Sequence, residues 1–394
     1  MQWWNSAIAG FWCLWVFVLG LMVGSFLNVL IARLPLEKSI IWPSSRCFAC
    51  FRAIRLTDNL PILGFLRLRG RCRHCGAKFS SRYLWVELGT GVSFLALFVL
   101  EVLENWQNIP TFKANPALLQ EAIPPMWACL MFAYHAFFLA CLIAAAVIDA
   151  EHRIIPPLIP FTGLLVGVIG GAFMPWPWPN PAAMGHLVDP ALPPSSPWSL
   201  PNFWGLVPVG VQLWPFYGPT FDFAPPGSIR LGLLNSIIGA FVGSLVVRFV
   251  KWLFETGFGR EAMGLGDADL LMMTGAFLGW QIAVISLFVG AFTALALKIV
   301  MMILVREPEP PKTAPIGGEP LNPRELPFGP GLALGVVVTW FGWPSLGPGT
   351  QYLFFDWVTL ALVVVIMGVG LLAAGLFLRR PAEPEPATTV STSA

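Results

Sequence analysis

The chain has 394 residues, of which 56% are hydrophobic and only 11% are charged, and its mean hydropathy is +0.72. This composition excludes a soluble domain of this size, because several apolar runs approach the roughly 20 residues that span a bilayer. The net charge of +2 argues against a nucleic-acid partner. The apolar runs are continuous rather than alternating, so we predict an all-α, polytopic transmembrane helix bundle in membrane lipid, with about eight to nine spans.

Residues 1–36 hold the first predicted span, from about Ile8 to Ile31. No basic residue precedes it, so we expect the N-terminus to lie outside the cell. Asn28 lies on this apolar helix. It is expected to hydrogen-bond a neighbouring helix, which is a common way for membrane helices to pack.

Residues 37–82 form a basic loop. Eleven of the 23 Lys and Arg residues lie between Arg33 and Arg82, against only Glu37 and Asp58. Loops rich in Lys and Arg stay on the cytoplasmic side of a membrane. We therefore predict that this loop is cytoplasmic.

Two cysteine pairs in this loop indicate a metal site. Cys47 and Cys50 form one pair, and Cys72 and Cys75 form the other, with 21 residues between the pairs. Two such pairs can place four sulfurs tetrahedrally around a structural Zn²⁺. Disulfides are the alternative, which a reducing cytosol disfavours. Three arginines flank the pairs and are expected to help keep the thiols deprotonated: Arg46, Arg71 and Arg73.

Residues 83–174 carry predicted spans two to four. Glu87, one turn inside span two, is interpreted as an interfacial carboxylate paired with a basic residue such as Arg82. Asp149 follows span three, about 126–148, where a solvated turn is the alternative to a functional role. His152, in the same turn, is interpreted as a surface residue.

A second carboxylate follows two glycines, in Gly264-Leu265-Gly266-Asp267. Ionisable side chains at membrane depth are costly, so they usually have a function. Charge counting places Asp149 and Asp267 at the inner ends of spans, where two carboxylates in a low-dielectric site share one proton. One can then activate water while the other protonates the scissile carbonyl, which predicts aspartic-protease chemistry.

The rest of the chain divides by composition. Residues 175–230 contain fourteen prolines and five tryptophans, without Lys or Arg before Arg230, and are interpreted as an extracytoplasmic insert. Spans five to seven lie in 231–305 and spans eight and nine in 331–380, with a cytoplasmic loop at 306–330 between them. Arg379 and Arg380 follow span nine and place the C-terminus in the cytoplasm. The tail, 381–394, is expected to be disordered.

Five segments in order resemble the type IV prepilin peptidases, a family of Gly-x-Gly-Asp membrane aspartic proteases. The segments are 24–35, the two cysteine pairs with Ser81 to Glu87, Ile148-Asp149 to Ile154, Gly264 to Asp267, and Pro327 to Ala333. The resemblance implies an enzyme of the bacterial inner membrane that removes the leader peptide of type IV prepilins or type II secretion pseudopilins at the cytoplasmic face. It also implies catalytic roles for Asp149 and Asp267.

Many members of this family also N-methylate the new N-terminus with S-adenosylmethionine, and the cysteine loop is typical of those bifunctional members. The donor-binding residues are not indicated by any motif. Three departures stand out: Asp269 replaces the usual lysine, Phe48 replaces a proline, and the 175–230 insert is extra. Asp269 is expected to raise the proton affinity of Asp267. The alternatives are another Gly-x-Gly-Asp intramembrane protease, or an inactive zinc-bearing membrane scaffold.

Overall fold

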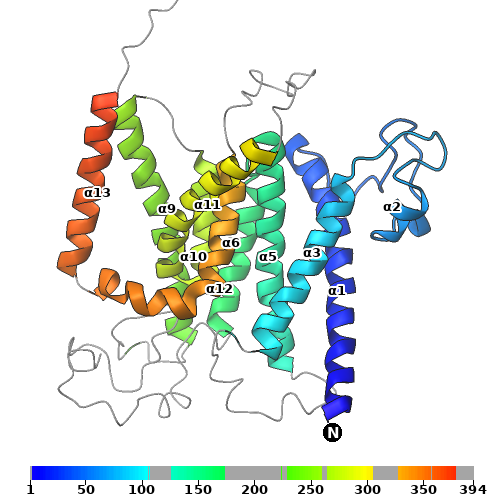
Figure 1. The fold of residues 1–394 in the computed structure, drawn as a ribbon, viewed down its shortest axis with the longest axis horizontal. Coiled ribbons are helices and arrows are strands. Elements are labelled where there is room, and N and C mark those ends of the chain that lie inside the picture. Colours follow the sequence, from blue (N-terminus) through cyan, green and yellow to red (C-terminus); the bar gives the residue numbers. More distant parts are fainter. Residues whose placement is uncertain are drawn as a thin grey trace, which may run out of the picture.

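The computed structural model describes residues 2–104, 106, 126–173, 223, 229–259, 264–304, 327–355 and 357–378. These residues form helices and loops without a β-strand, which confirms the predicted all-α class. The long helices stand side by side, and a small loop domain projects from one end (Figure 1). The helices are α1 (Gln2–Arg33), α2 (Leu63–Arg67), α3 (Arg82–Phe98), α5 (Met126–His152), α6 (Leu158–Phe173), α9 (Ile229–Phe258), α10 (Leu265–Leu278), α11 (Trp280–Leu304), α12 (Phe328–Phe355) and α13 (Trp357–Leu378).

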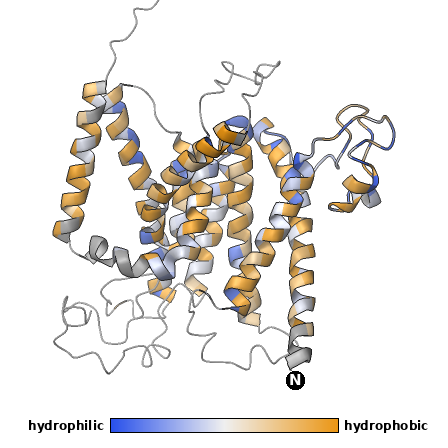
Figure 2. Cartoon of the chain, viewed as in Figure 1, coloured by the Kyte–Doolittle hydropathy of each residue, from blue (hydrophilic) through white to orange (hydrophobic). Residues whose placement is uncertain are grey.

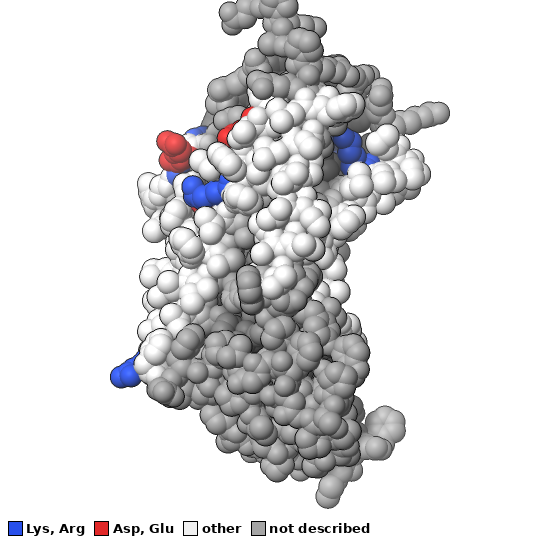
Figure 3. Space-filling view, turned by 90° about the vertical axis from the view of Figure 1, so that its left-hand side faces the viewer, with Lys and Arg blue, Asp and Glu red and all other residues white. Residues whose placement is uncertain are grey.

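Most residues of the long helices are hydrophobic (Figure 2), and many of their large apolar side chains are exposed at the surface. Six helical segments in the described ranges are long and apolar enough to cross a membrane, and α6 is a shorter apolar helix. Described charged side chains on the face in Figure 3 gather near the top and at one lower point, with uncharged residues between. A multi-pass membrane protein is thereby confirmed. The predicted eight to nine crossings remain a prediction.

An aromatic cluster ties the three central helices together. Phe277 of α10 stacks on Tyr134 and Phe138 of α5, with ring centroids 4.5 and 4.6 Å apart. Trp340 of α12 packs edge-on against Phe138 at 5.8 Å. Phe138, Phe277 and Trp340 are fully buried. Offset and edge-on contacts are the favoured geometries for aromatic rings, so this cluster holds α5, α10 and α12 in a fixed relation.

Glycines bring α9 and α10 into backbone contact. A Cβ atom built on Gly239 would lie 2.0 Å from the carbonyl oxygen of Gly275, and one on Gly243 would lie 2.2 Å from that of Leu271. Only hydrogen fits at such positions, and small residues let membrane helices approach this closely. Helices α10 and α11 are separated by Gly279, whose φ of 85° favours glycine.

Several sequence predictions concern residues outside the described ranges. These are nearly all of the 175–230 insert, residues 306–326 of the predicted loop at 306–330, and the tail at 381–394. The division of the chain into eight segments also remains a prediction. Helix α12 begins at Phe328, three residues before the region predicted to hold spans eight and nine, and continues to Phe355.

Candidate active site

Asp149 lies in the last turn of α5. The helix ends because Arg153 adopts a left-handed conformation, with φ of 58°, and donates its backbone N–H to the carbonyl of Asp149. Pro156 and Pro157 then start α6 in a new direction. Asp149 is 8% exposed, so its carboxylate points into the protein and not into a solvated turn.

Asp267 lies in the first turn of α10, which begins after the extended residue Gly264. A carboxylate is favourable there because the helix N-terminus carries partial positive charge. Gly266 has an ordinary helical conformation. Because it has no side chain, it lets the start of α10 approach the segment that follows Asp149. A Cβ atom on Gly266 would lie 2.9 Å from that of Ile155, just beyond the turn that follows Asp149.

The structure brings the two carboxylates together. Asp267 is 7% exposed, and the carboxylates of Asp149 and Asp267 are near enough for their charges to interact. The two residues are far apart in sequence and meet only because α5 packs against α10. Two carboxylates in a buried site hold one proton between them more stably than they hold two charges. Their catalytic roles remain a prediction at this point.

Gly329 completes the site, and sequence reasoning gave it no role. Its backbone N–H donates to Oδ2 of Asp149 at 2.9 Å. Gly329 lies in the first turn of α12, where backbone N–H groups have no partner within the helix. Asp149 therefore caps a helix distant in sequence. A Cβ atom on Gly329 would lie 2.6 Å from the same Oδ2, so any larger residue there would force the Asp149 carboxylate to shift.

The start of α12 is held in place by α11. The hydroxyl of Thr293 donates to the carbonyl oxygen of Gly331 at 2.6 Å. Gly335 and Gly290 also make close backbone contact, since a Cβ atom on Gly335 would lie 2.4 Å from Gly290 Cα. These contacts fix the N-terminus of α12 against Asp149. The late segment of the sequence thus belongs to the candidate active site.

Asp269 points to another partner. Its Oδ1 atom lies 3.4 Å from an Nη atom of Arg248 on α9, and its side chain is 17% exposed. The carboxylate that acts on Asp267 is Asp149. The expectation that Asp269 tunes Asp267 is therefore not supported, because the charge of Asp269 is offset by Arg248.

The predicted pairing of Glu87 with Arg82 is wrong. Glu87 is buried, and its Oε2 atom accepts the backbone N–H of Ile62, from the cysteine loop, at 2.7 Å. Arg82 instead forms an ion pair with Glu151. The side chain of Arg82, at the start of α3, reaches Glu151 on α5. The side chain of Glu87, five residues later, reaches the cysteine loop instead. His152 is a half-exposed surface residue, as predicted.

The four loop cysteines form one cluster. Their sulfurs all lie within 4.8 Å of one another, which is suited to a metal ion. The Sγ atoms of Cys47 and Cys75 are 3.7 Å apart, and those of Cys50 and Cys72 are 3.9 Å apart, too far for disulfides. The donor set therefore fits a tetrahedral ion such as Zn²⁺.

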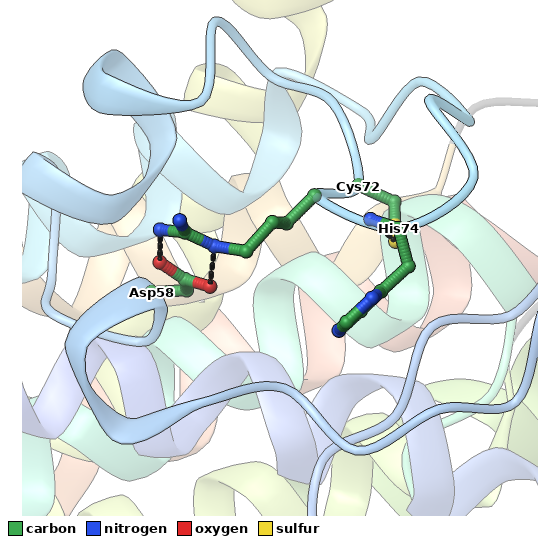
Figure 4. A network of polar contacts seen from close by, with 4 residues as sticks. Asp58, Cys72 and His74 are labelled. Carbon is green, nitrogen blue, oxygen red and sulfur yellow. Dashed lines mark hydrogen bonds and ion pairs between the residues drawn. The ribbon is translucent and has the colours of Figure 1, made fainter.

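Backbone groups, rather than the flanking arginines, prepare Cys72 to act as a ligand. The backbone N–H groups of Cys75 and His74 lower the pKa of Cys72 to about 6. Arg73 turns away and forms a two-pronged ion pair with Asp58 (Figure 4). This pair lowers the pKa of Asp58. His74 is exposed, so it is not a further ligand.

A buried ion pair lies outside the predicted site. Glu101 of the π-helical turn η3 (Val99–Leu103) pairs with Nδ1 of His135 on α5. Both side chains are almost completely buried, with exposed fractions of 1% and 0%. Sequence reasoning overlooked both residues. The signal was present, because each is an ionisable residue inside a predicted span.

The chain is similar to known proteins over most of its length. Residues 18–100 match a family model for the bacterial Peptidase A24 N-terminal domain, and residues 221–299 match one for the type IV leader peptidase family. No solved structure matches the chain significantly.

Curated relatives carry the name "Prepilin leader peptidase/N-methyltransferase". The one from Myxococcus xanthus is 30% identical over 320 residues, which cover 80% of this chain and 72% of the relative. One from Klebsiella pneumoniae is 30% identical, covering 68% and 86%. One from Pseudomonas aeruginosa is 28% identical, covering 85% and 89%.

Proposed function

Because the chain belongs to the type IV leader peptidase family, we propose that it is a membrane aspartic endopeptidase that cleaves the leader peptides of type IV prepilins or pseudopilins. The observation that carries this proposal is the buried pair of Asp149 and Asp267, joined across α5 and α10. Such a pair supplies both a general base and a general acid, which peptide hydrolysis needs.

The two aspartates share one proton in the proposed mechanism. The ionised carboxylate takes a proton from a water molecule, whose oxygen attacks the scissile carbonyl, while the protonated carboxyl donates to the carbonyl oxygen. Gly329 makes the pair asymmetric, since its N–H donates to Oδ2 of Asp149. This oxygen is held as an acceptor. The shared proton therefore lies on another oxygen of the pair.

The cysteine cluster is proposed to hold a structural Zn²⁺. Four thiolates from Cys47, Cys50, Cys72 and Cys75 fill a tetrahedral shell, which leaves no position for water or substrate. The ion would hold the two cysteine turns of the loop together. The names of the relatives support a second activity, N-methylation of the newly formed N-terminus with S-adenosylmethionine as donor.

The proposed orientation places the N-terminus outside the cell and the C-terminus, the cysteine loop and both aspartates on the cytoplasmic side of the inner membrane. The concentration of Lys and Arg in the loop between α1 and α3 supports it. Cleavage would then take place at the cytoplasmic face.

Cleavage of a co-expressed prepilin tests the proposal. Asp149→Asn and Asp267→Asn should each lower cleavage by about 100- to 10,000-fold, because each removes a proton-transfer group. Cleavage is measured on immunoblots of whole cells, and mass spectrometry of the product N-terminus reports methylation.

Asp269→Asn is the matched control. It makes the same chemical change two residues from Asp267, at a side chain that contacts Arg248 and not the pair. This variant should cleave at close to the wild-type rate. Normal cleavage by both Asp149→Asn and Asp267→Asn, at equal protein levels, would refute the proposed mechanism.

A further inference from the structure

The buried ion pair of Glu101 and His135 has no part in the proposed mechanism. Its side chains are 1% and 0% exposed, and Glu101 lies in the π-helical turn η3. Such turns often occur at functional sites, and ionisable residues inside a membrane span usually have a function. His135 precedes Asp149 by fourteen residues on α5, which is about 21 Å along the helix. The pair is therefore too far from Asp149 to exchange a proton with it.

The pair is unfavourable in one respect. The Oε2 atom of Glu101 is buried without a hydrogen-bond partner among the described residues. Two charges lose their hydration when they are buried, and apolar residues of similar size often stabilise such a site as well or better. A buried ion pair is therefore weak evidence of a stabilising role. The best-attested role of buried polar groups is to fix the register of one helix on another.

His135 connects the pair to α12, which packs along α5. Its imidazole ring contacts the indole ring of Trp340, with centroids 5.1 Å apart and an angle of 68° between the planes. Such edge-on contacts depend on the relative orientation of the two rings. Trp340 is fully buried, so it cannot move without displacing its close-packed neighbours. By orienting the His135 ring, Glu101 also restricts the position of Trp340.

A hydrogen bond holds the next residue of α12. The Nε1–H group of Trp106, three residues beyond the end of η3, donates to the carbonyl oxygen of Phe341 at 2.8 Å. Two successive residues of α12 are thus held by the region around η3, Trp340 through His135 and Phe341 through Trp106. These contacts restrict sliding of α12 along its own axis.

The first turn of α12 carries Gly329, whose N–H donates to Oδ2 of Asp149 at 2.9 Å. Helix α12 is therefore attached to α5 at two points, Trp340 to His135 and Gly329 to Asp149. Since α12 is one continuous helix, a displacement at Trp340 also displaces Gly329.

We propose that Glu101 and His135 are positioning residues for peptide cleavage. They set the register of α12 on α5, so that the N–H of Gly329 meets the carboxylate of Asp149. The inference rests on the leader-peptide cleavage proposed above, and it assigns the pair no contact with substrate.

Cleavage kinetics of purified full-length protein in detergent, with a purified prepilin as substrate, test the inference. Glu101→Gln keeps a hydrogen-bond acceptor for His135 but removes the charge. Glu101→Leu combined with His135→Leu replaces the whole pair with apolar side chains. Each variant should lower kcat about tenfold with KM nearly unchanged, because a small displacement of a catalytic group slows the chemical step. The double variant carries the test if Glu101→Gln does not fold, since replacement of both charges often preserves stability.

A double-mutant cycle with Gly329→Ala separates positioning from a general structural role. In Gly329→Ala the contact with Asp149 is already displaced. Adding Glu101→Gln, or the double Leu change, to Gly329→Ala should therefore lower kcat little further. Independent effects would multiply instead. A combined loss equal to the product of the separate losses would overturn the inference, because the pair would then not act through Gly329.

Glu104→Gln is the matched control, because it makes the same change three residues later at an exposed site. It should have the kcat of the wild type. Wild-type kcat in both Glu101→Gln and the double Leu variant would also overturn the inference, while leaving the proposed cleavage intact. A wild-type protein that does not cleave prepilin would instead refute the proposed function.

Discussion

The aspartate pair and the cysteine cluster are built in opposite ways. The four cysteines lie within one loop, and each pair occupies a tight turn whose backbone hydrogen bonds are local. The aspartate pair needs α5, α10 and α12, and its hydrogen bond joins Asp149 to Gly329, 180 residues away. One site depends on short-range spacing and the other on the packing of distant helices.

This difference predicts how each site fails. A metal site in a loop should be lost by removing its ligands, with little effect on the helices. The aspartate pair should be damaged by substitutions that never touch a carboxylate, provided that they shift one of its three helices. Each variant below breaks one site by the route that this comparison predicts.

The largest effect is expected at the crossing of α9 and α10. Gly239→Leu places a side chain where the carbonyl of Gly275 lies, so α10 must move and carry Asp267 with it. Overpacking of this kind destabilises a protein by about 1–3 kcal/mol. We expect a lower melting temperature and almost no prepilin cleavage. Gly370→Ala, at a position with open space around it, is the control. Full activity in Gly239→Leu would show that α10 can move without harm.

Gly329→Ala should damage the pair more locally. Its methyl group would lie 2.6 Å from Oδ2 of Asp149, so the carboxylate must turn away. Misplacement of a catalytic group by about 1 Å can lower the rate about 100-fold, and we expect a loss of that size in cleavage. Gly89→Ala on α3 adds the same methyl group in open space and should be neutral. Equal cleavage by the two variants would argue against a positioning role for Gly329.

Removal of the metal ligands should leave the helices intact. Cys72→Ser combined with Cys75→Ser should release about one equivalent of zinc, measured by elemental analysis of purified protein. Far-ultraviolet circular dichroism should change little, because most helical residues lie outside the loop. Cys13→Ser combined with Cys129→Ser is the control and should retain zinc. Zinc content that is unchanged in the first variant would contradict the assignment.

The smallest effect concerns the ion pair of Asp58 and Arg73. Arg73 lowers the pKa of Asp58, so the pair stabilises the loop above the ordinary carboxyl pKa of about 4. That contribution is lost as the pH falls through the lowered pKa. Hydrogen exchange in residues 37–82 should therefore be faster in Asp58→Asn than in wild type at pH 6. The difference should shrink below about pH 4, and a difference that grows in acid would contradict the pairing.

The sequence predicted the local site well because its geometry follows from spacing. Two residues between paired cysteines are enough to form the ligand turns, wherever the loop lies. The position of Asp149 and Asp267 at helix ends also follows from the sequence, because the apolar runs stop or start beside them. Their contact with Gly329 does not, because nothing in the spacing of 180 residues specifies which helix N-terminus faces Asp149.

Glu87 is a second residue whose contact could not be predicted from its position in the sequence. A nearby arginine suggested its partner, yet Arg82 points to α5 and Glu87 accepts from Ile62. Sequence proximity on a helix says little about partners when the rotation of the helix is unknown. The rotation of α3 is fixed by its packing on α1, where Gly24 approaches the backbone of Glu87.

The buried pair of Glu101 and His135 has a consequence for how the protein is made. Glu101 leaves the ribosome 34 residues before His135. Its carboxylate, which is buried in the folded protein, therefore emerges before its partner has been synthesised. A lone charged residue in an inserting helix costs up to roughly 3 kcal/mol at the helix centre and less near an end, where Glu101 lies. Insertion of α3 and α5 together avoids that cost. The pair therefore favours entry of these two helices into the membrane as one hairpin, before α10 and α12 are synthesised.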